Sequence, residues 1–448
     1  MGKTKMLNAG MPDINNSSNT SGLDADATVS KRGRRAWMVV AGSAAALSVS
    51  VVPLFMSTSG VFLKPISDEF GWSRGAISAG VAIGGLLSVL VQPMVGSAID
   101  KWGVRRVVPV GVILMALNLA ALAVTPAVLG VYVLLVALLA VTGGPQNPVS
   151  YVKTVARWVD RRRGLAIGLA VTGVAIGQAV IPQYAQYLVG LFGWRAGYFG
   201  LAALLLIVAL PSVLGLVRDP KPGEVPGTTV HPLAADQATQ KLTGISVRSA
   251  LRNRTFWLLA SSVLLATMVI VGTTIHAVPL LTDNGWSPAE AAGSLAALGM
   301  ASIAGRIFAG LLYDRFHAPK VGAIVFAVAC LGIVFLASGT APIFALITIG
   351  FAAGAETDLI AFLASRYFGL HSYSQLTGYL FGAAGIGTGL GPVVLGTAFD
   401  VNGTYTSVLF LFAGALLIAA ALLLFLPKTY PFPTGSKATE SGNVSMTS

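Results

Sequence analysis

The sequence is poor in charge and in cysteine. Asp, Glu, Lys and Arg together make up 10% of the 448 residues, whereas soluble domains carry about a quarter. So few charges cannot cover the surface of a water-soluble fold of this size, so much of that surface must face an apolar solvent. A single cysteine, Cys330, excludes an intrachain disulfide framework.

Motifs for metal binding and for catalysis are also missing. The four histidines are scattered and form no cluster with metal-ligand spacing. No Walker-type Gly-x-x-x-x-Gly-Lys loop occurs, which argues against ATP-driven pumping. We therefore expect a protein that is not an enzyme, with no metal site and no cofactor.

Apolar sequence, by contrast, is abundant. Hydrophobic residues make up 55% of the chain, in continuous runs of about 20 residues, which is the length that a helix needs to cross a bilayer core. Lipid cannot satisfy backbone polar groups, so the runs are predicted to be helices of an all-α membrane protein. We predict twelve transmembrane helices, at about 36–63, 75–98, 104–124, 127–152, 164–190, 194–217, 255–282, 288–312, 320–338, 341–364, 375–398 and 405–427.

Polar segments divide these helices into two sets. The longest internal polar stretch, 218–254, is predicted to be a cytoplasmic central loop between six-helix bundles at 36–217 and 255–427. The polar tails 1–35 and 428–448 are expected to lie in the cytoplasm, and the first of them to be disordered.

The cations alternate along the chain. Of the 29 Lys and Arg residues, 25 lie in the two tails, the central loop and every second gap between spans. The other gaps hold only Lys64, Arg74 and Arg195, and Arg306 lies inside the eighth span. The positive-inside rule then places both termini in the cytoplasm of a cell whose plasma membrane (the inner membrane, in a bacterium) the chain crosses many times. The net charge of +12 is thus a signal of topology. The lipid bilayer, and not a nucleic acid, is the expected partner, and we expect a monomer.

A repeat relates the two sets of helices. The tripeptide GWS occurs at 71–73 and again at 285–287, an offset of 214 positions. The same offset relates Gly96 to Gly310, Asp100 to Asp314, and Arg106 to Lys320. One spacing kept across a pair of helices predicts two pseudo-symmetric six-helix bundles, an arrangement known from transporters.

The segment G-x-x-x-D-K-x-G-x-R-R at 96–106 closely resembles the loop signature between spans 2 and 3 of the major facilitator superfamily. Its copy at 310–320 keeps the glycine, the aspartate and basic residues, but has His317 where a glycine would sit. The resemblance covers about residues 36–427. It implies a secondary transporter whose two bundles rock around a site at the midplane of the membrane.

The signature also predicts a cytoplasmic latch. A glycine allows a neighbouring helix to approach closely, an aspartate can accept backbone N–H groups at a helix end, and arginines can pair with carboxylates or lipid phosphates. A basic loop that only sets topology is the alternative. The predicted gating residues are Gly96, Asp100, Arg105, Arg106, Gly310, Asp314 and Arg315.

Four further segments are similar to the monocarboxylate-transporter-like branch, which includes bacterial oxalate/formate-type carriers. They are 68–78, 157–173, 192–200 and 359–369. This resemblance implies movement of small organic anions, often together with a proton and sometimes by exchange.

The sequence departs from that branch at three positions. Ser57 stands where animal-type members have a lysine in the first span, and Ser302 stands where an aspartate precedes Arg306 by one helical turn. The eleventh span contains no cation, although oxalate-type members have a lysine there. The sequence therefore does not identify lactate, pyruvate or oxalate as the substrate.

Arg306 is the main candidate for binding a substrate anion. It lies eight residues before Asp314, or about 12 Å inside the membrane. A charge at such depth costs at least about 2.5–3.5 kcal/mol and is a functional candidate for that reason. A guanidinium fits a carboxylate. The alternative is an internal ion pair that holds helices together.

Glu356 and Asp358 in the tenth span are candidates for proton coupling. A carboxylate that is shielded from water can bind and release a proton. Because the two residues are two positions apart on a helix, at most one of them should face a cavity, and Asp358 is the slightly preferred choice. The competing interpretation is that one of them pairs with Arg306 or caps a helix.

Other polar residues within the spans either line a substrate pathway or hydrogen-bond helices together. His276 could relay a proton, or be a structural histidine. The remaining candidates for substrate binding are Gln146, Asn147, Tyr151, Gln178 and Gln183.

The sequence as a whole predicts a secondary transporter that moves a small organic anion, a monocarboxylate or aromatic acid, in symport with H⁺. The alternative is a proton-driven antiporter or efflux carrier of amphipathic compounds. The drug-antiporter signature of the fifth span is incomplete here, because no glycine immediately precedes Pro182. That absence, together with the cationic Arg306, favours the organic anion.

Overall fold

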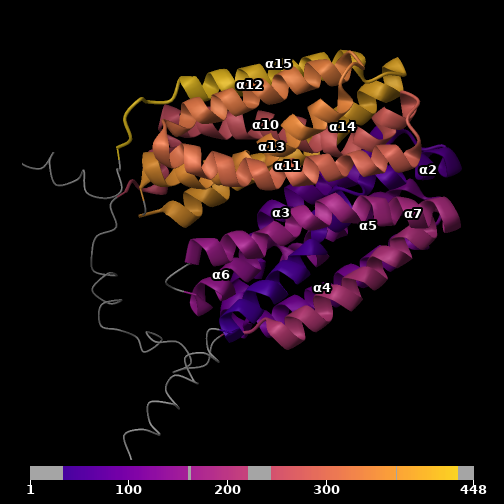
Figure 1. Ribbon diagram of the computed structural model, residues 1–448, viewed down its shortest axis with the longest axis horizontal. Coiled ribbons are helices and arrows are strands. Elements are labelled where there is room, and N and C mark those ends of the chain that lie inside the picture. Colours follow the sequence, from indigo (N-terminus) through magenta and orange to yellow (C-terminus); the bar gives the residue numbers. More distant parts are fainter. Residues whose placement is uncertain (1–33, 160–162, 220–243, 370, 432–448) are drawn as a thin grey trace, which may run out of the picture.

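The computed structural model describes residues 34–159, 163–219, 244–369 and 371–431. The regular structure in these ranges is helical, apart from an isolated antiparallel bridge between Gly244 and Gly369. Long helices lie side by side along the longest axis of the molecule (Figure 1). The predicted all-α membrane fold is confirmed, because ten of the described helices are long and apolar enough to cross a bilayer.

Residues 34–219, which we call the N-half, form the indigo to magenta part of Figure 1. Its first span, Arg34–Phe70, contains a π-helix and a second helical segment. The elements are η1 (Val52–Met56), α2 (Ser59–Phe70), α3 (Arg74–Trp102), α4 (Val104–Ala123), α5 (Leu129–Thr142), η2 (Gly144–Gln146), α6 (Pro148–Trp158), α7 (Arg163–Pro211) and η3 (Ser212–Leu216).

Residues 244–431, the C-half, form the orange to yellow part of Figure 1. It begins with a short helix and continues with six long ones. The elements are α9 (Val247–Leu251), α10 (Arg254–Asp283), α11 (Pro288–Arg315), α12 (Ala318–Ala337), α13 (Pro342–Phe368), α14 (Tyr373–Asn402) and α15 (Thr406–Leu424).

The ten long helices account for eleven of the twelve predicted crossings, and a shorter, interrupted segment accounts for the other. The apolar helix Leu165–Leu216 is 52 residues long and contains two predicted spans, which meet at Gly193. There the φ angle of 81° breaks the helical path. The fourth predicted span consists of α5, which is only 14 residues long, followed by η2 and α6.

The first and fourth spans are interrupted, and their interruptions lie next to each other. The first span changes to a π-helix that contains Pro53, and the fourth stops at Gly143 before a 3₁₀ turn that contains Pro145. A Cβ atom on Gly143 would lie 2.9 Å from Cγ2 of Val51. Proline removes a helical hydrogen bond, so breaks are expected here. The equivalent spans of the C-half, α10 and α13, run as single helices.

The repeat seen in the sequence is present in the backbone. Gly71 and Gly285, which are 214 positions apart, both adopt positive φ angles, of 66° and 89°. Ser73 and Ser287 then cap α3 and α11, each through its hydroxyl oxygen, which accepts a backbone N–H bond. The second span of each half thus begins with the same turn and cap.

The repeat differs at Gly103 and His317. Gly103 has a φ angle of 80°, a conformation that favours glycine. His317 has a φ angle of −68° and lies in extended backbone after α11, which ends at Arg315. The histidine is accommodated because the second copy of the loop does not make the left-handed turn of the first.

The two halves contact each other mainly at the end of the molecule that lies away from the chain termini. We call the end at which the chain enters the first span and leaves α15 the terminal face. At the other end, the opposite face, a Cβ on Gly396 would lie 2.7 Å from the backbone nitrogen of Gly75. Towards the terminal face, Gly96 of α3 and Gly378 of α14 have no neighbouring atom within 4 Å of the Cβ position. Figure 1 shows the two halves converging near α2 and the end of α14.

Candidate functional site

Arg306 forms an ion pair with Asp358. The Nη1 atom of Arg306 on α11 lies 3.2 Å from Oδ1 of Asp358 on α13. The two side chains remain 31% and 32% exposed. The ion pair that was the alternative interpretation of Arg306 is therefore present, but both partners remain accessible.

The face of α11 that carries Arg306 points towards the N-half. Gly299 of α11 packs against α7, where a Cβ would lie 2.8 Å from the nitrogen of Ala179 and 3.0 Å from the oxygen of Ala175. Arg306 follows Gly299 by seven residues, which is two helical turns, and therefore lies on the same face of the helix. The guanidinium is thus placed beside the junction of the halves, nearer the terminal face than Gly299.

Glu356 takes a different direction from Asp358, as their spacing predicts. It is 6% exposed and accepts a hydrogen bond from the hydroxyl of Thr267 on α10 at 2.5 Å. Glu356 therefore joins two helices within the C-half. Of the two carboxylates, Asp358 is the one that is partly exposed and paired with a cation.

Within the described ranges, the predicted polar residues of the N-half make no hydrogen bond to Arg306, which bonds to Asp358. The Tyr151 hydroxyl donates to Oε1 of Gln146, and both residues are fully buried beside the break in the fourth span. Asn147 is half-buried at the start of α6. Gln178 and Gln183 are half-buried on α7.

The predicted gating residues lie at the terminal face and make few contacts. Arg105 donates from Nη2 to the carbonyl of Leu214 within the N-half. Gly96 and Gly310 have no neighbour within 4 Å of the Cβ position, so the close approach expected at Gly96 is not made in this conformation. The exposed members of the set are Arg105, Arg106, Asp314 and Arg315, and the Asp100 side chain lies outside the described part of the structure.

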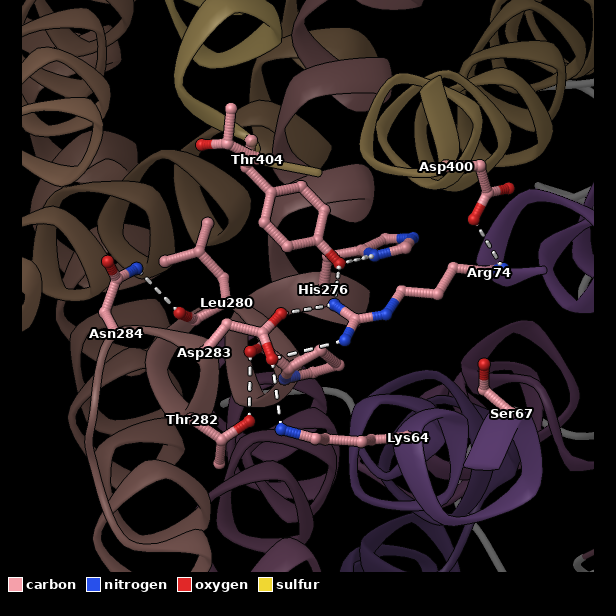
Figure 2. Close-up of polar contacts among 12 residues, drawn as sticks. Lys64, Ser67, Arg74, His276, Leu280, Thr282, Asp283, Asn284, Asp400 and Thr404 are labelled. Carbon is pink, nitrogen blue, oxygen red and sulfur yellow. Dashed lines mark hydrogen bonds and ion pairs between the residues drawn. The ribbon is translucent and has the colours of Figure 1, made fainter. Parts of the chain in front are cut away.

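A second charged cluster lies at the opposite face, and it joins the two halves (Figure 2). Its centre is Arg74 at the start of α3, whose side chain is 9% exposed. The guanidinium donates to both carboxylate oxygens of Asp283, at 2.5 and 3.2 Å. Lys64, at 3.1 Å, is a second and more exposed partner of Asp283. We call Lys64, Arg74, His276, Asp283, Asp400 and Tyr405 the Arg74 cluster.

Two other elements of the C-half complete the Arg74 cluster. The carboxylate of Asp400 accepts the backbone N–H groups of Arg74 at 2.9 Å and Gly75 at 2.8 Å. These two orphan donors at the start of α3 are thus capped by the other half of the molecule. The phenol oxygen of Tyr405 accepts from Arg74 at 2.7 Å, and the guanidinium lies 3.8 Å from the ring centroid of Phe399.

His276 lies in the Arg74 cluster rather than beside Arg306. Its Nδ1 atom lies 3.0 Å from the Tyr405 hydroxyl, and its Nε2 atom 3.0 Å from the carbonyl oxygen of Pro392. Ser78 lies 3.4 Å from Nε2. The ring is fully buried.

The sequence analysis did not single out the Arg74 cluster as a site, although a signal for it was present. The gaps on this side of the membrane hold only three cations, Lys64, Arg74 and Arg195. Each of the three makes an ion pair: the first two with Asp283, and Arg195 with Glu69 at 2.7 Å. Where charge is this scarce, each charged residue is a candidate for a specific contact.

Twelve crossings in two similar halves, with charged side chains inside spanning helices, define a transporter of small molecules. The chain belongs to the Major Facilitator Superfamily, whose sequence model matches residues 45–392.

Proteins similar to this chain include carriers of the monocarboxylate type. Monocarboxylate transporter 13 of Bos taurus is 29% identical over 406 residues, which cover 88% of this chain and 90% of that protein. Monocarboxylate transporter 11 of Homo sapiens is 28% identical over 357 residues, which cover 75% and 72%. The structure of the nucleoside transporter NupG aligns with a TM-score of 0.65 at 18% identity, covering 88% of this chain and 98% of that one. This likeness to NupG shows the shared fold.

Proposed function

We propose that the protein carries a small organic anion, a monocarboxylate or aromatic acid, across the membrane together with H⁺. In this proposal the two halves rock about their junction and expose a central site to each side in turn. The terminal face is the cytoplasmic side, because 25 of the 29 cations belong to its loops and tails. The arrangement described above is then closed to the outside, with the Arg74 cluster as its outer closure.

The Arg306–Asp358 pair carries the proposal. In the absence of substrate, the two charges compensate each other. A proton on Asp358 removes the negative charge, and the Arg306 guanidinium then becomes available to a substrate carboxylate. Loss of the proton restores the internal pair and displaces the anion, so proton and anion travel together in a ratio of one to one.

The packing around Ser302 adds support. Ser302 stands where the branch that this chain resembles has an aspartate, and its backbone lies against Gly354 of α13. The close approach of α11 and α13 brings Asp358 to Arg306. The carboxylate partner of the arginine is then supplied by the neighbouring helix instead of by the preceding turn.

The test is uptake into proteoliposomes of a panel of labelled monocarboxylates, aromatic acids and amphipathic cations under an imposed pH gradient. We expect a lower pH outside the liposomes to drive uptake of one of the labelled acids. Arg306→Ala should reduce this uptake at least about 100-fold, since it removes a charge-assisted bidentate contact of about 3 kcal/mol. Arg252→Ala, which changes an exposed arginine near the terminal face, is the matched control.

The Asp358→Asn variant tests proton coupling separately from anion binding. This variant mimics the protonated side chain, so it should still exchange labelled for unlabelled anion but lose the response to the pH gradient. If Glu356→Gln instead of Asp358→Asn has this phenotype, the proton site is Glu356. Retention of carboxylate uptake by Arg306→Ala would refute the anion site, and transport of the amphipathic cations alone would favour the efflux alternative.

A further inference from the structure

We propose that His276 makes the outer closure respond to protons: the neutral imidazole stabilises the Arg74 cluster, and a proton on Nδ1 favours opening to the outside. The inference rests on the alternating access of the proposed function, but not on the identity of the substrate or on Arg306.

The hydrogen bonds around His276 assign its tautomer. The carbonyl oxygen of Pro392 can only accept, so Nε2, at 3.0 Å, must carry a hydrogen. A guanidinium can only donate, so the phenol oxygen of Tyr405 accepts from Arg74. The hydroxyl hydrogen of Tyr405 is then free to point at Nδ1, which lies 3.0 Å away and accepts it as the bare nitrogen of a neutral ring.

A proton on Nδ1 disrupts this chain of donors. Nδ1 would become a donor facing an oxygen that already accepts from Arg74, and the Tyr405 hydroxyl would lose its acceptor. The ring is fully buried, so water at its surface cannot replace the lost bond.

The charges around the ring act in the same direction. Lys64 on α2 and Arg74 on α3 are cations, and Asp283 on α10 and Asp400 on α14 are anions, so the cluster is balanced when His276 is neutral. Both carboxylates are already engaged: Asp283 with the two cations, and Asp400 with the backbone N–H groups at the start of α3. A charged ring would therefore give the cluster a net charge of +1, and would place that charge beside Arg74, with which the ring shares the Tyr405 oxygen.

The location links this local change to gating. His276 and its partners Pro392 and Tyr405 belong to the C-half, whereas Arg74 and Ser78 belong to the N-half. Loss of the Tyr405 bridge weakens the contact between the halves at the place where the start of α3 packs against the end of α14. Opening exposes the cluster to outside water, which can solvate the imidazolium. A more acidic exterior therefore shifts the protein towards the state that accepts cargo from outside.

The distance between two exposed outer positions, measured by double electron–electron resonance, tests the proposal in nanodiscs without any substrate. Spin labels on Phe192→Cys in the N-half and Val401→Cys in the C-half suit this, since the native side chains are 69% and 83% exposed. Cys330→Ala removes the native thiol. Between pH 8 and pH 5.5 we expect the ratio of long to short distances to rise about five-fold, which corresponds to a tenfold weaker proton affinity of the closed state for a ring whose ordinary pKa is about 6.5.

Substitution of His276 decides whether the ring is the sensor. His276→Gln keeps a donor and an acceptor but cannot be charged, so it should retain the short distance at pH 8 and lose the pH response. His371→Gln, which changes an exposed histidine at the terminal face, should respond like the parent protein. Tyr405→Phe should raise the long-distance fraction already at pH 8.

The proposal is overturned if the parent protein shows no pH-dependent change in distance. It is also overturned if His276→Gln shows an undiminished change. These outcomes are independent of the organic-anion proposal, because no substrate is added. Loss of carboxylate uptake in Arg306→Ala and loss of the pH-dependent distance change in His276→Gln are separate results.

Discussion

Single charged residues in this protein are held by partners from other helices. Arg306 pairs with Asp358 on α13, and Arg74 binds Asp283 on α10. The sequence could indicate that each of these charges needs a partner, because a lone charge in a membrane is costly. It could not identify the partners, because the Arg74–Asp283 pair spans 209 positions and depends on how the two halves meet.

Asp283→Asn is expected to weaken the closed arrangement. The Arg74 side chain is 9% exposed, so this change leaves a largely buried cation with neutral partners only: the amide oxygen at position 283, Tyr405 and the Phe399 ring. We expect a loss of about 2 kcal/mol, less than for a fully buried pair because Asp283 is partly solvated. Unfolding titrations in detergent measure this loss.

Lys64→Gln is the control for that experiment. Lys64 is 40% exposed and pairs with the same carboxylate, so its removal should cost less than about 1 kcal/mol. Equal losses in the two variants would mean that Asp283 does not stabilise the protein chiefly through Arg74.

His317, at the terminal face, is a titratable residue outside the spans. The His317 ring stacks on Tyr430, with ring centroids 5.3 Å apart, and the Tyr430 hydroxyl accepts the backbone N–H of Ala318 at 3.0 Å. Burial, together with the positive charge of Lys320, lowers the pKa of His317 below its usual value of 6.5. The neutral ring is the form that suits the docked segment around Tyr430, so docking is strongest above that value and weakens as the pH falls through it.

Tyr430→Ala should therefore raise the pKa of His317 towards 6.5, because it exposes the ring. Tyr430→Phe keeps the stacked ring and should preserve most of the lowering. Nuclear magnetic resonance of ¹⁵N-labelled histidine follows the titration. An unchanged pKa in Tyr430→Ala would show that the docked segment does not shield the histidine.

At the scale of helices, sequence reasoning was accurate where apolar length or a local motif decides the structure. Runs of about 20 apolar residues predicted the spans, and the tripeptide GWS predicted an internal repeat, which the structure shows as two equivalent turns with glycines at positive φ. It was less accurate where packing decides. The left-handed glycine at 103 has no counterpart at His317, and nothing local indicated that His276 would join Arg74.

The contact between α3 and α14 depends on glycine at Gly396. A Cβ there would lie 2.7 Å from the nitrogen of Gly75 and 2.8 Å from the carbonyl carbon of Arg74, and this backbone cannot move aside easily. We expect Gly396→Ala to destabilise the protein by about 1–3 kcal/mol through overpacking, as measured by unfolding in detergent.

Gly378→Ala on the same helix is the matched control. No atom lies within 4 Å of that Cβ position, and alanine favours a helix over glycine by up to about 1 kcal/mol, so this variant should be as stable as the parent or more stable. A similar loss of stability in both variants would contradict the proposed role of close packing at Gly396.

For the whole molecule, the distribution of cations makes the two faces different. The loops of the terminal face are basic, whereas the opposite face carries few cations and has them bound in ion pairs. The sequence could predict this sidedness from counting alone. It could not predict which end of the molecule is closed: all the predicted gating residues belong to the terminal face, whereas the halves pack tightly at the opposite face.

Orientation can be measured with two single-cysteine variants of the Cys330→Ala protein. Val401 is 83% exposed at the opposite face, and Lys101 is exposed at the terminal face. A membrane-impermeant maleimide should label Val401→Cys in intact cells, and should label Lys101→Cys only after the membrane is permeabilised. The reverse pattern would contradict the topology inferred from charge.

The paired interruptions of the first and fourth spans give the two halves different mechanical properties. A helix with a broken ladder of hydrogen bonds flexes at low cost, whereas α13 has no interior proline and α10 has one only near its end, at Pro279, so both resist bending over most of their length. At these two pairs of equivalent spans we therefore expect the C-half to be stiffer than the N-half. Changes in lateral pressure or in bilayer thickness would deform the N-half first, and would alter the transport cycle through that half.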